Sequence, residues 1–179
     1  MSAFEYVFAF YSLILGLAAA EVVSGFADMW RDRRRIEVGF CTPVLALCVL
    51  LGIMNTWITF WAYREILEVG AEFMLVTALT ALPYVFIARL MFPREGQGVS
   101  LEEHFFEHRR FMLIGVAAPV IVGRVWALVD GRGYPGGFEG AYFAIRILIP
   151  LALLFTANRR VNRIGLALIP FVQIAGLFR

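Results

Sequence analysis

The sequence predicts an all-α polytopic membrane protein, in which about six transmembrane helices form a single integral membrane domain over residues 1–179. Three observations carry this prediction. Of the 179 residues, 61% are hydrophobic, well above the roughly 45–50% of soluble domains. The mean hydropathy is +0.77. Long apolar stretches are separated by connections that are alternately rich and poor in arginine. The net charge of +2 is too small to indicate a nucleic-acid partner.

The first apolar stretch, residues 4–29, is long enough to cross a bilayer, because about 20 helical residues span a hydrocarbon core of ~30 Å. Glu5 stands where a signal peptide would carry positive charge, so we interpret the stretch as a retained helix. Small side chains recur there at every fourth position and predict a flat face against which another helix packs. These residues are Ser12, Gly16, Ala20 and Ser24.

Five further apolar stretches follow, at residues 38–62, 70–92, 111–129, 140–157 and 163–178. The last two are short for full crossings, so five crossings with one re-entrant segment is an alternative. Cys41 and Cys48 lie about 10 Å apart if the second stretch is helical, which is too far for a disulfide. We therefore expect two buried free thiols there.

The connections between the stretches predict the topology. Arginines cluster after the first, third and fifth stretches, whereas the second and fourth connections balance their arginines with acidic residues. By the positive-inside rule the arginine-rich connections are cytoplasmic, and both termini lie on the non-cytoplasmic side. The clustered residues are Arg31, Arg33, Arg34 and Arg35; Arg94, Arg109 and Arg110; and Arg159, Arg160 and Arg163.

The third connection contains a helix start. Ser100 followed by Glu103 is a capping box, and it predicts a short helix that runs into the fourth stretch. His104 and His108 lie one turn apart on this helix, and Glu103 and Glu107 are interleaved with them. Two imidazoles and a carboxylate are ligands for a transition metal. Because the usual additional ligands are missing, we favour a solvated face next to the membrane over a metal site, and we expect no cofactor.

Two pairs of segments resemble each other, residues 16–24 with 115–123 and residues 82–90 with 169–177. A duplication would divide the chain into halves of residues 1–93 and 100–179. With three crossings in each half, the halves would form an inverted 3+3 repeat, which is a recurrent plan among secondary transporters. Chance similarity between apolar segments is the alternative.

Polar residues inside the apolar stretches are costly in lipid and face protein or water. By depth alone, Arg89 is the expected partner of Glu21, while Glu72 is expected to pair with Arg124 or Arg146. Glu72 and Arg89 can also reach the interface by snorkelling, which we favour. Arg124 and Arg146 either line an outward-facing cavity that attracts an anion or serve structural pairing, and we favour the pairing. The full set is Glu21, Asn55, Glu72, Arg89, Arg124, Arg146 and Gln173.

Aromatic residues gather at the end of the second stretch. Trp57 and Trp61 lie one helical turn apart, and Tyr63 follows them. Aromatic residues of this kind are enriched where a helix leaves the membrane. We interpret them first as an interfacial belt and second as a ligand wall.

Two motifs carry a resemblance. Residues 11–17, Tyr-Ser-Leu-Ile-Leu-Gly-Leu, and residues 104–111, His-Phe-Phe-Glu-His-Arg-Arg-Phe, resemble recurring patterns in an uncharacterised group of small polytopic bacterial membrane proteins. The resemblance covers most of the chain. It implies a location in the bacterial inner membrane and implies no activity.

Two functional hypotheses from different classes follow. The first is a small transporter or channel with a polar intramembrane pathway. The second is a non-transporting scaffold or accessory subunit, in which the flat helix face and intramembrane pairs serve assembly. An enzyme that uses His104 and His108 is a third, less favoured hypothesis. The expected partners are the lipid bilayer and either further copies of the chain or another membrane protein. The candidate pathway residues are Glu21, Asn55, Glu72, Arg89, Arg124 and Arg146.

Overall fold

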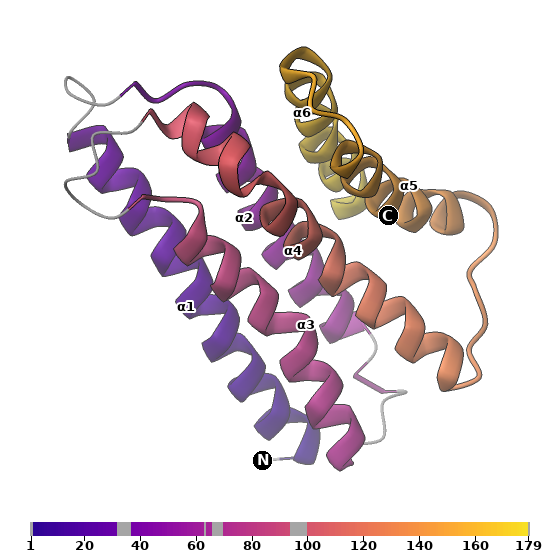
Figure 1. Ribbon diagram of the computed structural model, residues 1–179. Helices are drawn as coiled ribbons and strands as arrows, with labels where there is room; N and C mark the ends of the chain where they lie inside the picture. The colour runs from indigo at the N-terminus through magenta and orange to yellow at the C-terminus, as the bar shows by residue number, and fades with distance from the viewer. Residues whose placement is uncertain (1, 32–36, 63, 66–69, 94–99, 179) are drawn as a thin grey trace.

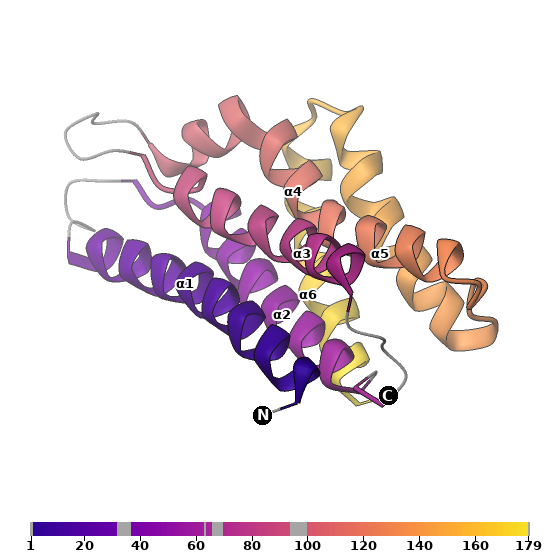
Figure 2. The same cartoon turned by 90° about the horizontal axis from the view of Figure 1, so that it is seen from below.

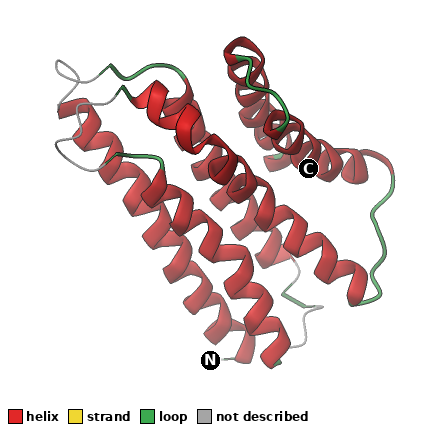
Figure 3. Cartoon of the chain, in the orientation of Figure 1, coloured by secondary structure: helices red, strands yellow, loops and turns green. Residues whose placement is uncertain are grey.

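The computed structural model describes residues 2–31, 37–62, 64–65, 70–93 and 100–178, and within them it contains six α-helices and no strand (Figure 3). The prediction of an all-α membrane bundle is confirmed. Five helices, α1 to α5, are long and apolar enough to cross a membrane, and α6 is not among them. The helices are α1 (Ala3–Arg31), α2 (Cys41–Ala62), α3 (Ala71–Leu90), α4 (Leu101–Val129), α5 (Gly137–Leu154) and α6 (Arg159–Leu177).

The helices follow one another up and down the bundle. Helix α3 packs between α1 and α4, and these three lie in a row in Figure 1. Helix α2 packs behind them and also contacts α6, while α5 bridges α4 and α6. Seen from below in Figure 2, α1 and α3 end, and α2 and α4 begin, at the end of the bundle opposite the N-terminus. This arrangement gives the bundle two distinct ends.

We call the end at which α2, α4 and α6 begin the basic end. There the Leu101 N–H donates to the Glu37 carbonyl (3.1 Å), and the Arg163 guanidinium pairs with the Glu102 carboxylate (2.9 Å). The described parts of the three arginine-rich connections therefore meet at one end, as their alternation with arginine-poor connections predicts. The predicted features at Arg33, Arg34, Arg35, Tyr63 and Arg94 lie outside the described residues.

The start of α4 is as predicted. The Ser100 hydroxyl accepts a hydrogen bond from the Glu103 N–H (3.5 Å), and the helix then continues without a break through residues 111–129. A side-chain oxygen at this position satisfies one of the backbone donors that a helix start leaves without a partner. Cys41 and Cys48 are free and buried, which confirms the expectation of two apolar thiols.

The flat face of α1 is not the face that packs against the other helices of this chain. The face that packs against the rest of the chain consists of larger residues, including Tyr11, Leu15 and Val22. Gly16, Ala20 and Ser24 are exposed, and only Ser12 makes a contact, accepting a hydrogen bond from the Trp57 indole (2.9 Å). Larger side chains make more van der Waals contacts when they are buried, so packing favours the face that carries them.

The two halves of the chain pack differently. Helix α1 packs closely along α3, whereas α4 and α6, the corresponding pair in the second half, are not closely packed and are joined near their first turns by side-chain contacts. The contacts there are the pair of Glu102 with Arg163 and the stacking of Arg159 on Phe106. The internal repeat therefore stays a prediction from the sequence.

Candidate functional site

A cavity of about 330 Å³ opens at the end where α1, α3 and α5 begin, which we call the cavity end. Five helices, α1 to α5, and the connection after α4 contribute to its wall. Among the described lining residues, the charged ones are all arginines. The lining includes the cations Arg124, Arg132 and Arg146, the hydroxyl residues Thr56, Thr59, Thr77 and Thr80, and the aromatic residues Tyr11, Phe60, Phe73, Trp126 and Phe143.

Arg146 is the most unusual of these residues, because it is a charge buried near the middle of a membrane helix. Its residue is 6% exposed. Helix α5 begins at Gly137, three residues before the predicted stretch, so Arg146 lies about 13 Å along the helix and not near its start. Its Nη1 donates to the Tyr142 hydroxyl (3.0 Å), one turn earlier. Within the described part of the chain, no carboxylate forms an ion pair with it.

A polar network holds the Arg146 side chain. The Tyr142 hydroxyl accepts from Arg146 and donates to Asn55 Oδ1 (2.9 Å). Asn55 Nδ2 donates to the backbone carbonyls of Leu51 (2.9 Å) and Gln173 (3.0 Å). The network thereby joins α2, α5 and α6 behind the cavity. The hydrogen-bond partner of the Arg146 guanidinium is therefore a neutral hydroxyl.

The other two arginines of the wall have different environments. Arg124 is half-buried, and its guanidinium carbon lies 3.9 Å from the centre of the Phe143 ring. Arg132 forms an ion pair with Asp130 (2.6 Å). Arg124, like Arg146, forms no ion pair within the described residues. The structure thus brings Arg124 and Arg146, which sequence depth placed in the same half of the membrane, into one cavity.

A further donor at the cavity wall has no acceptor. The Nε1 atom of Trp126 is buried, and no hydrogen-bond acceptor reaches it within the described structure. Buried indole N–H groups usually find a partner. Among the described lining residues the positive charges are those of Arg124, Arg132 and Arg146, and no carboxylate lines the cavity.

Phe60, which the sequence did not single out, is one of the aromatic residues of the wall. Phe60 stacks on Tyr11 (ring centres 4.5 Å apart) and contacts Phe73 (5.3 Å). Trp57 and Trp61 are 44% and 47% exposed and do not line the cavity. Trp57 and Trp61 therefore fit the interpretation as an interfacial belt. The aromatic residue of α2 that lines the cavity is Phe60 instead.

The remaining depth-based pairings have mixed outcomes. Arg89 Nη2 lies 2.8 Å from Glu21 Oε1, so the expected pair between α3 and α1 is present. The side chains of Arg89 and Glu21 are 71% and 27% exposed, and neither residue lines the cavity. Glu72 is exposed and pairs with neither Arg124 nor Arg146. That pairing was wrong, because depth does not specify which way a helix faces.

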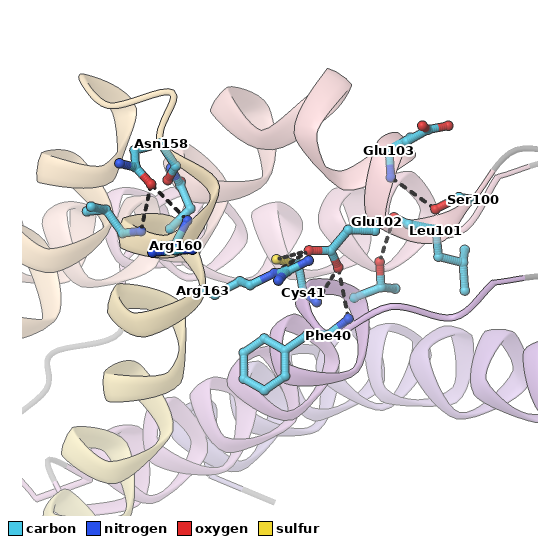
Figure 4. A network of polar contacts seen from close by, with 12 residues as sticks. Phe40, Cys41, Ser100, Leu101, Glu102, Glu103, Asn158, Arg160 and Arg163 are labelled. Carbon is cyan, nitrogen blue, oxygen red and sulfur yellow. Dashed lines mark hydrogen bonds and ion pairs between the residues drawn. The ribbon is translucent and has the colours of Figure 1, made fainter.

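At the basic end, the carboxylate of Glu102 lies at the centre of a closed network (Figure 4). Its Oε2 accepts from the N–H groups of Phe40 (2.8 Å) and Cys41 (2.9 Å), which open α2. Its Oε1 accepts from Cys41 Sγ (3.2 Å) and from Arg163 Nε (2.9 Å), at the start of α6. One side chain of α4 thus ties the first turns of three helices.

Sequence reasoning missed Glu102, Arg163 and Tyr142 as functional or structural centres. Tyr142 and Arg146 are spaced four residues apart, which was a usable signal that they share a helix face. The role of Glu102 had no such signal, because its partners lie about sixty residues away on either side. Only the packing of α2, α4 and α6 brings them together.

The chain matches no protein-family model, no curated protein and no solved structure. The fold and the apolar helices define the class of the protein, a multi-pass α-helical membrane protein. Its site has to be interpreted from its own chemistry.

Proposed function

We propose that this chain is a small membrane transport protein whose cavity binds an organic anion that carries an apolar ring or short chain. The observation that carries the proposal is Arg146, a buried guanidinium at the cavity wall with no carboxylate partner among the described residues. A cation at mid-membrane depth costs about 2.5–3.5 kcal/mol on insertion scales. A purely structural arginine would be expected to have this cost offset by an ion pair.

The composition of the wall supports an anionic ligand with an apolar part. Arg146 and Arg124 offer donors, and a carboxylate or sulfonate offers only acceptors. Phe60, Phe73 and Phe143 supply apolar surface. A volume of about 330 Å³ is at the lower end of small-molecule sites, so the ligand is small.

The difference between the two ends of the bundle agrees better with a carrier mechanism than with an open pore. The cavity is lined from one end, whereas the Glu102 network closes the first turns of α2, α4 and α6 at the other. Secondary transporters bind their substrate between such ends and open one at a time. By the positive-inside rule the cavity would face the non-cytoplasmic side of a bacterial inner membrane.

The second candidate function is a non-transporting scaffold or accessory subunit. It is favoured by the exposed small residues Gly16, Ala20 and Ser24 on α1, which are suited to close packing against a helix of another chain. It is also consistent with the Glu21–Arg89 pair, which lies outside the cavity. On this hypothesis Arg146 would bind nothing.

The two functions are separated by binding and flux of benzoate, a small aromatic carboxylate. We expect saturable benzoate binding to the chain in lipid nanodiscs and saturable uptake into proteoliposomes. Arg146→Gln should weaken binding by at least about tenfold, since a hydrogen bond to a charged group contributes about 1.5–3 kcal/mol. Arg64→Gln is the matched control, because Arg64 pairs with Glu65 at the same end and does not line the cavity.

The scaffold would be favoured by a folded, inserted chain that neither binds nor carries any member of a panel of benzoate, octanoate and benzenesulfonate. Equal benzoate binding by the wild-type chain and Arg146→Gln would mean that the buried guanidinium does not bind the ligand.

A further inference from the structure

The clearest cluster of metal-ligating side chains lies far from the cavity, on the first turns of α4 at the basic end. His104, Glu107 and His108 each offer one ligand atom, and these atoms lie within 4.8 Å of one another. The imidazole rings of the two histidines have centres 4.5 Å apart. A spacing of four residues places both rings on the same side of the helix.

The environment of His104 differs from the solvated face that the sequence predicts. The residue is 8% exposed, and its Nε2 lies 2.9 Å from the carbonyl oxygen of Leu90, at the end of α3. A carbonyl oxygen only accepts, so Nε2 carries the proton. The other ring nitrogen, Nδ1, is then left with its lone pair when the ring is neutral.

His108 repeats this arrangement one turn later. Its Nδ1 lies 3.2 Å from the carbonyl oxygen of His104, so Nδ1 donates and Nε2 keeps a lone pair. Metal-binding histidines characteristically donate their second ring N–H to a backbone carbonyl or a carboxylate, which fixes the tautomer and the ring orientation. Both histidines here have their N–H anchored in that way.

The carboxylate of Glu107 completes the set. The residue is exposed and forms no ion pair among the described residues. Around tetrahedral Zn²⁺, with bonds of about 2.0–2.1 Å, neighbouring ligand atoms lie about 3.3 Å apart. Each pair of ligand atoms here therefore has to approach by about 1.5 Å at most, which small rotations of the three side chains can supply.

We propose that His104, Glu107 and His108 bind one Zn²⁺ ion, with water in the fourth position, at the basic end of the bundle. Two imidazoles and a carboxylate favour zinc and the later transition metals over Mg²⁺ and Ca²⁺, which prefer oxygen ligands. This site does not depend on the anion cavity, and either proposal can fail without the other.

The test is isothermal titration of ZnCl₂ into the full chain in detergent micelles, purified without a polyhistidine tag and treated with a chelator. We expect about one Zn²⁺ per chain, no comparable binding of Mg²⁺, and a higher melting temperature with Zn²⁺ bound. His108→Ala and Glu107→Gln should each weaken Zn²⁺ binding by at least about tenfold.

Two controls make the outcome decisive. Glu103→Gln changes an exposed carboxylate of the same helix that is outside the donor set, and it should leave Zn²⁺ binding unchanged. Cooperative thermal unfolding of each variant, measured without metal, shows that it is folded. The proposal is overturned if the folded wild-type chain binds no Zn²⁺, or if binding survives the combined His104→Gln and His108→Ala substitution.

Discussion

The buried charged side chains at the two ends of the bundle have opposite environments. At the basic end, Glu102 is buried and nearly saturated with donors, including the guanidinium of Arg163. At the cavity end, Arg146 is equally buried, yet its hydrogen-bond partner within the described structure is the neutral Tyr142 hydroxyl. A closed pair stabilises the contact between helices, whereas an open charge beside a cavity is suited to a ligand. Arg146 is therefore the charge to test for ligand binding, and Glu102 is the charge to test for stability.

The largest effect on stability is expected at the basic end. Glu102→Ala leaves the Phe40 and Cys41 N–H groups and Arg163 without their acceptor, and it should lower the free energy of unfolding by about 3 kcal/mol. Chemical denaturation in mixed micelles measures this change. Glu103→Ala, at the neighbouring exposed position, is the control. If both substitutions cost the same, the network is not a closed contact.

Arg146→Met should separate binding from stability. A long apolar side chain removes the buried charge, so the free energy of unfolding should stay the same or rise, by up to about 1–4 kcal/mol. Benzoate binding should fall by about ten- to a hundredfold, because one charged hydrogen-bonding partner is lost. Denaturation and binding are measured on the same preparation. A large loss of stability would mean that Arg146 holds the helices together, as Glu102 does.

Gly176→Ala should disturb the cavity end from behind. A Cβ at this position would overlap the Tyr142 hydroxyl, which holds both Arg146 and Asn55. Overpacking of this kind costs about 1–3 kcal/mol, and weaker benzoate binding should accompany it. Gly16→Ala is the matched control, since nothing lies within 4 Å of its added Cβ. We expect the melting temperature to fall for Gly176→Ala and to stay unchanged for Gly16→Ala.

The smallest effect is expected at Glu21. Its partner Arg89 has a side chain that is 71% exposed, and pairs that are this open contribute about 0–1 kcal/mol. Glu21→Gln should therefore change unfolding little and leave the uptake of benzoate unchanged. Uptake is compared with the wild-type chain in proteoliposomes of equal protein content. A loss of uptake would mean that Glu21 belongs to the transport pathway, as the sequence predicts.

The sequence by itself determined the six helices, the cap at Ser100 and the grouping of the arginine-rich connections. These features depend on hydrophobic length, on side chains close in sequence and on charge counts, all of which can be read along a single chain. It also predicted the Glu21–Arg89 pair, because depth alone brought those two residues to the same level.

Only the tertiary structure decided which way each helix faces. The rotation of α1 put its larger residues inside and its small residues outside, and the rotation of α3 turned Glu72 away from both cavity arginines. The same choice gathered Arg124, Arg146 and Phe60 around one cavity and brought Glu102 to the starts of α2 and α6. Such rotations are set by packing against several distant helices at once, and in near-uniformly apolar helices the local pattern specifies them weakly.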